Sequence, residues 1–427
     1  MLLLLAGTDP ASAPNEQQAA TNGPITIESA AHAAVEWHPA IGEASGELGA
    51  RGEEVAAARA GYLPLVSAGV GSGYDSRVNS SWRPRPQVGA SQMLFDFGKV
   101  SSAVEAARAG TRAGKAQLML AIDTLVRDVA YAVVELQRSI ALHAVAEEQA
   151  TSIRQISGLV GKRSAQGAAT RSDALQVQAR VEAAEANVTQ VAAEQRRWAS
   201  NLAFLLGRPA PTTNVTADVP EWLMQSCARP LPAWDDVPAV AVAVARADEA
   251  RAELRRNRAE RFPTVSLAGD ASTDLVSPTG NSSIYSFGLR VSHNVFGGGL
   301  TRARVRGAEY SLSAAEAGAQ RARTDTSQQM AEAQQQIGSL SELVDTLASR
   351  EDNMRETGKL YRLQYLEMGT RTLVDLLNAE QELQQVRFQR VNTAHDLRRL
   401  EVDCLFLSGR TRDAFGLTGT RVQGVTL

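Results

Sequence analysis

The 427-residue sequence predicts an α+β membrane protein, in which a transmembrane β-barrel shared between subunits continues into a long α-helical coiled-coil tunnel. Three observations predict this fold class: an internal duplication, two pairs of amphipathic strand segments, and long proline-free stretches with heptad spacing. Aromatic residues make up only 5% of the chain, whereas Ala, Gln, Glu and Arg recur throughout. The latter residues favour long helices because they lose little side-chain entropy there.

The chain repeats one structural plan. Three pairs of similar segments lie 199 residues apart, namely 38–41 with 237–240, 59–64 with 258–263, and 97–98 with 296–297. Two later pairs lie 202 residues apart, namely Gly167 with Gly369 and Asp173 with Asp375. We therefore infer an internal duplication, with a three-residue length difference inside the segment that begins at Gly98 and ends at Gly167.

This duplication sets the predicted domain organisation. Residues 1–13 resemble the remnant of a secretory signal peptide, because a leucine run is followed by Ala11-Ser12-Ala13. The first repeat, 24–207, comprises a helix, a β-hairpin at 62–97, and long helices at 98–165 and 170–206. A linker at 208–237 precedes the second repeat, 238–409, which has a helix, a β-hairpin at 262–296, and long helices at 297–366 and 370–408. Residues 410–427 form a C-terminal tail.

Each predicted hairpin contains a strand with one apolar and one polar face. In the second repeat the alternating larger residues are Tyr285, Phe287, Leu289, Val291, His293 and Val295. In the first repeat they are Val66, Ala68, Val70 and Tyr74. This period of two is typical of a strand, and about 10–12 residues is the length of a tilted membrane-spanning strand.

The long helices carry the second signal. In both return helices, apolar residues step by three and four, and the two repeats share one register, since Val177 and Trp198 fall on Ala379 and Leu400. Heptads of this length predict coiled-coil packing. No segment outside the N-terminus approaches the ~18 apolar residues that a membrane helix needs, so strands must cross any membrane.

Four amphipathic strands per chain predict an oligomeric channel. A sheet of four strands is too small to close on itself, and each open edge would leave backbone groups unpaired in the bilayer. Sharing the strands between subunits removes those edges. The closed barrel would have a lumen, and the Gly- and Ser-rich polar strand faces suit a water-filled one.

Other function classes find little support. A net charge of −3 gives no electrostatic footprint for nucleic acid. The sequence contains no catalytic motif, no metal-ligand spacing and no cofactor fingerprint, so we expect neither an enzyme nor a bound cofactor. Cys227 and Cys404 form no motif and lie far apart, and we expect neither a disulfide framework nor a zinc site.

Residues 368–379, Met-Gly-Thr-Arg-Thr-Leu-Val-Asp-Leu-Leu-Asn-Ala, resemble the periplasmic tip motif of the TolC family of outer-membrane channel proteins. The duplicated plan, residues 95–99 and 296–299 at the strand ends, and residues 407–409 extend this resemblance over nearly the whole chain. The resemblance implies a homotrimer in the outer membrane of a Gram-negative bacterium, with a periplasmic extension. It further implies contact with outer-membrane lipid, a periplasmic adaptor (membrane fusion) protein, and an inner-membrane ABC or RND-type pump. The expected function is the exit duct of a tripartite efflux or type I secretion system.

The same resemblance implies roles for residues at the tip. Asp375 and Asn378 match the two acidic rings of the pore constriction, of which this chain keeps only the first acid. Arg371 matches a residue that latches neighbouring coils, and we group Thr370 and Tyr365 with it; the family's latch tyrosine would fall on Leu366. Gly167 and Gly369 form the turns at the helix tips. On the residues alone, Asp375 is equally well explained as an acid that stabilises a helix start.

The alternative reading is a soluble or surface-attached coiled-coil scaffold without channel activity. It explains the heptads but not the signal-like N-terminus or the two strand pairs.

Overall fold

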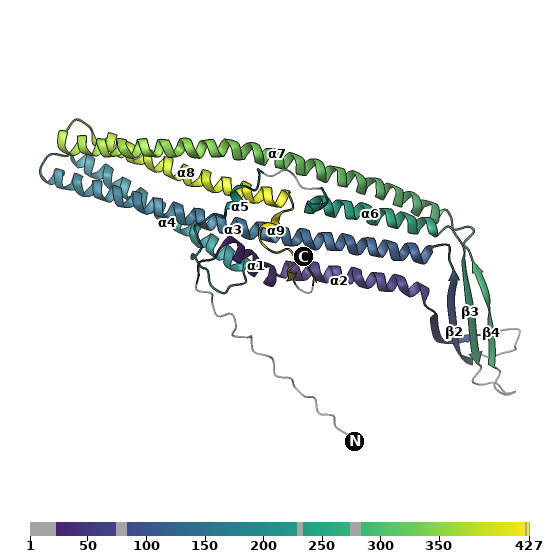
Figure 1. Cartoon of the computed structure of the whole chain (residues 1–427). Helices are drawn as coiled ribbons and strands as arrows, with labels where there is room; N and C mark the ends of the chain where they lie inside the picture. Colours follow the sequence, from purple (N-terminus) through teal and green to yellow (C-terminus); the bar gives the residue numbers. More distant parts are fainter. Residues whose placement is uncertain (1–22, 74–82, 229–233, 274–282, 423–424, 427) are drawn as a thin grey trace, which may run out of the picture.

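The computed structural model describes residues 23–73, 83–228, 234–273, 283–422 and 425–426. Figure 1 shows an elongated molecule, with a small sheet at one end and, at the other, the turns that connect two pairs of long helices. The long elements are α2 (Pro39–Arg59), α3 (Lys99–Ala165), α4 (Arg171–Leu205), α6 (Pro238–Ala259), α7 (Leu300–Leu363) and α8 (Leu373–Leu407). Shorter helices are α1 (Ile27–Trp37), α5 (Glu221–Met224) and α9 (Thr411–Ala414). Among the described residues, no helix combines the length and apolar character needed to cross a membrane.

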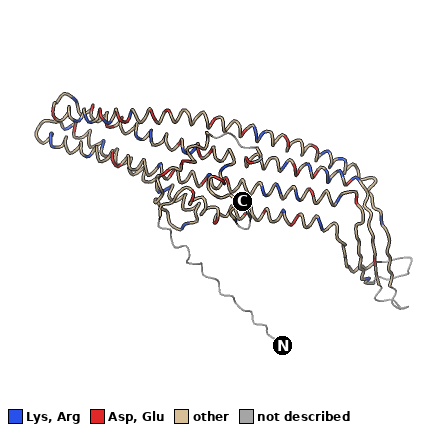
Figure 2. Tube along the Cα trace, viewed as in Figure 1, with Lys and Arg blue, Asp and Glu red and all other residues tan. Residues whose placement is uncertain are grey.

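α3 and α7 run through most of the molecule and organise its two halves. Next to the sheet, α2, α3, α6 and α7 lie side by side in one layer, and toward the tip α3 pairs with α4 and α7 with α8 (Figure 1). α3 has 67 residues, which extends about 100 Å at ~1.5 Å per residue. Lys, Arg, Asp and Glu are spread along the helices and are sparse on the strands (Figure 2).

The sheet has the order β1-β2-β3-β4 and is antiparallel throughout. Its strands are β1 (Leu65–Gly73), β2 (Arg83–Phe95), β3 (Thr264–Thr273) and β4 (Ser283–Ser292). The registers Ala68↔Val88, Val88↔Ala271 and Ala271↔Tyr285 place these residues on one apolar face that runs across all four strands. The opposite face carries Gly and Ser residues and an ion pair of Arg290 with Asp270 at 3.8 Å.

β4 is shorter than expected. The alternation predicted a strand through Val295 and a helix from residue 297, but β4 ends at Ser292 and α7 begins at Leu300. Ser292 pairs with Thr264, the first residue of β3, so β4 ends at the point where its antiparallel partner begins. Gly298 and Gly299 then adopt the left-handed conformation, with φ of 61° and 85°, and turn the chain into α7.

The structure locates the three-residue difference between the repeats. Phe97 and Gly98 are consecutive left-handed residues before α3, as Gly298 and Gly299 are before α7, so the junction of the second repeat is two residues longer. The third residue lies in η3 (Gln364–Met368), a π-helical turn at the end of α7. A π turn closes over i+5 rather than i+4 and therefore accommodates one extra residue.

The main core lies where α1 packs on the middle of α3. Large buried residues include Ile122, Leu136 and Leu202, and the C-terminal tail adds Phe415 and Leu417. Ile25 forms a parallel bridge with Val215, so the linker lies against the start of the first repeat.

The predicted signal-peptide remnant, 1–13, lies outside the described residues.

The expectation that Cys227 and Cys404 form no disulfide is wrong. They are bonded to each other across a sequence separation of 177 residues, and the bond ties the segment after α5 to the last turn of α8. Ser226 also donates a hydrogen bond from Oγ to the Glu401 carbonyl, at 2.8 Å. The spacing of the two cysteines in the sequence gives no information on this pairing, because it depends on how the linker packs against α8 of the second repeat.

Candidate functional site at the helical tip

Both tip turns have the same local structure. Gly167 and Gly369 follow the ends of α3 and η3 in the left-handed conformation, with φ of 73° and 64°, which glycine adopts without steric cost. Three residues later, Thr170 and Thr372 cap α4 and α8, and each exchanges hydrogen bonds with the aspartate at the third helical position. The sequence predicted both turns at these glycines.

Asp375 is the capping-box acid of α8. Its Oδ2 accepts hydrogen bonds from the Thr372 backbone N–H at 3.1 Å and from the Thr372 hydroxyl at 2.9 Å. These bonds, backbone first, hold the pKa of Asp375 below its ordinary value, so the group is ionised at neutral pH. Asn378 lies one helical turn further and is exposed. In the other tip, Asp173 accepts a hydrogen bond from the Thr170 backbone N–H at 2.9 Å, and hydrogen bonding to Thr170 likewise lowers its pKa.

Arg371 is anchored to the end of α7 in this chain. Its guanidinium lies over the Tyr361 ring, 4.4 Å from the ring centroid, and its Nε donates to Gln364 Oε1 at 3.2 Å. The Thr370 backbone N–H donates to the Gln364 carbonyl at 3.2 Å. The segment that carries Arg371 is thus fixed on η3 by contacts within one subunit.

Tyr365 contacts α3 rather than Arg371. It is 7% exposed, and the Arg163 guanidinium lies 4.9 Å from the centroid of its ring. Arg163 Nη1 also donates to the Tyr365 carbonyl at 3.1 Å. Burial raises the pKa of the Tyr365 phenol, against a smaller lowering by Arg163. This contact joins the ends of α3 and α7, and residues of α3, α4 and α8 form a small apolar core around it.

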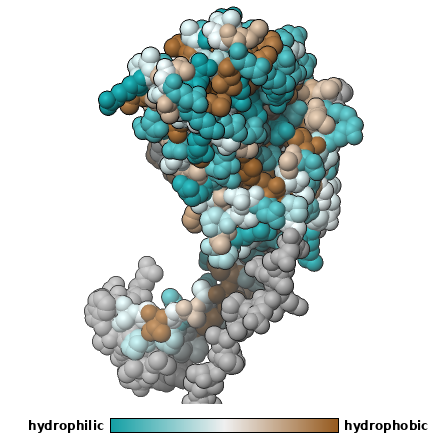
Figure 3. Space-filling view, turned by 90° about the vertical axis from the view of Figure 1, so that its left-hand side faces the viewer, coloured by the Kyte–Doolittle hydropathy of each residue, from teal (hydrophilic) through white to brown (hydrophobic). Residues whose placement is uncertain are grey.

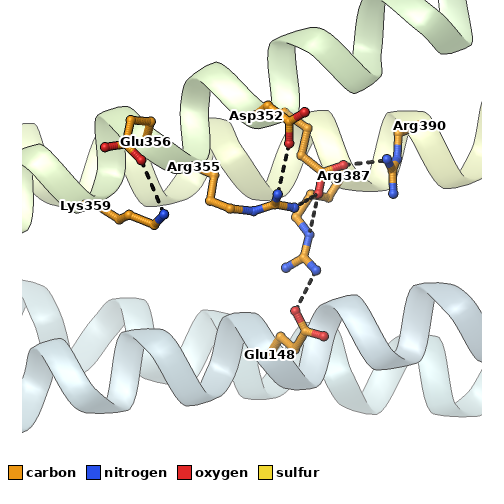
Figure 4. Close-up of polar contacts among 8 residues, drawn as sticks. Glu148, Asp352, Arg355, Glu356, Lys359, Arg387 and Arg390 are labelled. Carbon is orange, nitrogen blue, oxygen red and sulfur yellow. Dashed lines mark hydrogen bonds and ion pairs between the residues drawn. The ribbon is translucent and has the colours of Figure 1, made fainter.

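Two buried carboxylates tie α7 and α8 to each other and to α3 further from the tip. Glu351 of α7, 2% exposed, pairs with Arg355 at 2.6 Å and Arg390 at 3.0 Å, and Arg387 bridges it to Glu148 of α3 (Figure 4). A buried carboxylate is costly unless it is paired, so these arginines fix the spacing of the helices.

Glu380 of α8 forms the second such contact. Its Oε1 lies 3.2 Å from Arg362 Nη2, and its Oε2 accepts from Ser152 Oγ of α3 at 3.0 Å.

Viewed along the molecule from the tip, the surface is mostly hydrophilic with scattered hydrophobic residues (Figure 3).

Sequence reasoning brought Arg371, Thr370, Asp375 and Asn378 to one tip, and the structure places them together between η3 and the first turns of α8. It missed Arg163, Tyr361 and the buried Glu351, because their contacts depend on how the helix ends and neighbouring helices pack in the folded chain.

Most of the chain is similar to known outer-membrane proteins. The model of a family described as outer membrane efflux protein matches residues 30–208 and 233–409, once in each repeat. The chain belongs to the outer membrane efflux protein family. The efflux protein is therefore a transport protein and serves as an outer-membrane exit duct for efflux or secretion.

Individual relatives agree with this family. The efflux protein is 28% identical to Protein CyaE of Bordetella pertussis over 402 residues, which cover 87% of this chain and 81% of the relative. Its fold is similar to the outer membrane protein VceC of Vibrio cholerae, with a TM-score of 0.78, 18% identity, and coverage of 90% and 96%. It is also similar to the CmeC outer membrane channel of Campylobacter jejuni, with a TM-score of 0.77, 14% identity, and coverage of 96% and 94%.

Proposed function

We propose that three copies of this chain close one β-barrel in the outer membrane of a Gram-negative bacterium and one helical tunnel that extends into the periplasm. The observation that supports this most strongly is the exposed sheet. β1 and β4 each have a strand neighbour on one side only among the described residues. In a membrane, each unpaired backbone group at an open sheet edge costs several kcal/mol. Closure of the barrel between copies removes that cost.

The two faces of the sheet support the same arrangement. On the apolar face Tyr285, Phe287 and Leu289 are 79%, 85% and 72% exposed, which is unfavourable in water and favourable against lipid. The other face of β4 carries Ser286, Gly288 and Arg290, which suit a hydrated lumen.

At the tip, we propose that Asp375 and Asn378 from three copies line the narrowest part of the tunnel. Arg371 and Thr370 would hold the tip closed until a partner displaces them, and Tyr365 would support this latch by fixing the end of α7 on α3. A periplasmic adaptor and an inner-membrane pump of the ABC or RND type would supply the cargo, in tripartite efflux or type I secretion.

Planar bilayers test the channel directly. Purified protein added to one side should give discrete, ohmic conductance steps, and cell fractionation should place the chain with outer-membrane lipid. The soluble-scaffold alternative predicts a protein that remains in the soluble fraction and gives no steps. That result would remove the channel proposal.

A further inference from the structure

The end of the helical layer that meets the sheet carries a group of arginines in the second repeat. Arg302, Arg304 and Arg306 lie in the first two turns of α7, and Arg261 lies in the turn that joins α6 to β3. All four side chains are exposed, and within the described residues none has an ion-pair partner. The strands next to them carry few charged residues (Figure 2). We call these four residues the junction arginines.

The acids of this region leave a surplus of positive charge beside α7. Glu309 of α7 is already paired with Arg258 of α6, at 2.9 Å. Glu260 is exposed and has no ion-pair partner within the described residues, but it is a single acid beside four arginines. Glu53 and Glu54 lie on α2, at the other edge of the layer (Figure 1). The junction arginines are therefore not neutralised within the described part of the chain.

Packing within the chain does not account for the arginines of α7. Val305 of α7 occupies the position of Val104 of α3, 201 residues earlier, because the two helices begin after Gly299 and Gly98. Both valines are buried, with 1% and 6% of their surface exposed. In the first repeat, the positions that correspond to Arg302, Arg304 and Arg306 hold Ser101, Ala103 and Glu105. The same helix start therefore packs equally well without arginine.

Exposed aromatic rings lie at the same end of the molecule. Tyr62 and Phe262 precede β1 and β3 and are 47% and 48% exposed, and Phe296, between β4 and α7, is 88% exposed. The apolar face of the sheet ends at this level, because the strands end here. Aromatic side chains are enriched where the hydrocarbon of a membrane meets the lipid headgroups. In the proposed barrel, the junction arginines therefore lie at the level of the headgroups.

The spacing of the arginines places one on each flank of the helical layer. Residues of an α-helix turn by about 100° each, so Arg302 and Arg306 lie on one side of α7 and Arg304 lies about 200° from Arg302. The side between these flanks holds Val305 and Ala308, which pack on Leu254 of α6. One flank of the layer faces lipid and the other faces the lumen, so at least one arginine of α7 reaches the lipid side.

We propose that the junction arginines bind the phosphate groups of anionic phospholipids in the periplasmic leaflet of the outer membrane. A guanidinium group donates two parallel hydrogen bonds to a phosphate, and its long apolar stem packs along the hydrocarbon boundary. Net-anionic lipids are favoured because the headgroup of a zwitterionic lipid also carries a positive charge. This inference rests on the proposed function, because the junction lies at the headgroups only if the sheet spans the membrane.

Native mass spectrometry of the full-length protein with an equimolar mixture of dioleoylphosphatidylglycerol and dioleoylphosphatidylcholine tests the lipid preference. The parent should retain more of the anionic lipid. Arg302→Ser combined with Arg304→Ala inserts the residues of the first repeat, so the fold should tolerate it. This variant should lower the ratio of bound anionic to zwitterionic lipid at least about fivefold, the order of effect of one basic residue near an anionic surface. Raised salt should reduce the parental preference.

Arg246→Ser combined with Arg321→Ala is the matched control. These arginines are also exposed and without an ion-pair partner in the described part of the chain, but they lie roughly 20 Å and 30 Å from the junction ends of α6 and α7. The control should keep the parental lipid ratio.

Three results would overturn the inference. A parent without lipid preference that still gives conductance steps in planar bilayers overturns it and leaves the proposed function standing. A parental lipid ratio in the variant at the junction also overturns it, and loss of trimer in that variant at an unchanged ratio would assign the arginines to contacts between copies. A parent with neither conductance steps nor lipid preference overturns both proposals.

Discussion

Asp173 and Asp375 have the same local structure in the two tips, so the capping box alone cannot distinguish a pore residue from a helix-start acid. Each accepts hydrogen bonds from the threonine three residues before it, and each has a lowered pKa. The sequence predicted both acids at helix starts, because the Thr-x-x-Asp pattern is local. It did not predict the contact of Arg163 with Tyr365, which depends on how the two helix pairs meet.

The difference between the two acids should appear in ion selectivity. Three Asp375 carboxylates around a narrow aqueous axis would attract cations, so Asp375→Asn should lower cation selectivity and weaken block by a trivalent cation in planar bilayers. Raised salt should screen part of this difference. Asp173→Asn is the matched control and should change neither property. Unchanged selectivity in Asp375→Asn would assign the residue to helix capping alone.

Glu401 predicts a pH dependence of stability. Burial raises its pKa from 4.5 to about 7, against a lowering by Arg398, so the folded state holds this proton more tightly than the unfolded state. The free energy of unfolding therefore loses this contribution as pH rises from 4.5 to about 7. Glu401→Gln should match the parent at pH 4.5 and be more stable by about 1–3 kcal/mol at pH 8, since one pKa unit corresponds to about 1.4 kcal/mol. Thermal unfolding in detergent at both pH values measures this, and a gain at pH 4.5 instead would refute it.

Among the secondary-structure elements, those with a periodic sequence were predictable and their junctions were not. The alternation from Tyr285 to Val291 identified β4, but the same alternation continues through Val295, past Ser292, which pairs with the first residue of β3. Similarly, the duplication revealed three extra residues, but not that one of them would form a π turn at Gln364–Met368. Such features depend on strand partners and helix neighbours rather than on local pattern.

The disulfide is the element-scale contact with the clearest energetic prediction. It closes a loop of 177 residues, for which chain entropy gives a stabilisation of at most about 5 kcal/mol. Cys227→Ser with Cys404→Ser should therefore lower the melting temperature and abolish its dependence on added reductant. Ser226→Ala is a useful control, because it removes the neighbouring hydrogen bond to Glu401 but keeps the disulfide. A melting temperature equal to that of the parent would show that packing alone holds the linker on α8.

For the whole molecule, the sequence predicted the exit duct from the unpaired edges of its four strands and from the resemblance of residues 368–379 to the TolC family. The sheet has open edges at β1 and β4, and the helical layer has open edges at α2 and α7. The proposed head-to-tail ring would close both pairs of edges at once. The sequence could not predict how those helix edges fit, because the exposed residues of α2 and α7 are known only from the folded chain.

The number of chains in the purified complex tests this account most directly. Native mass spectrometry from mild detergent, with circular dichroism on the same sample, measures the stoichiometry and the strand content together. We predict a complex of three chains that retains its strands, because the edges of each four-stranded sheet need a neighbour. A monomer with full strand content would contradict the shared barrel, and with it the account of this chain as one third of a channel.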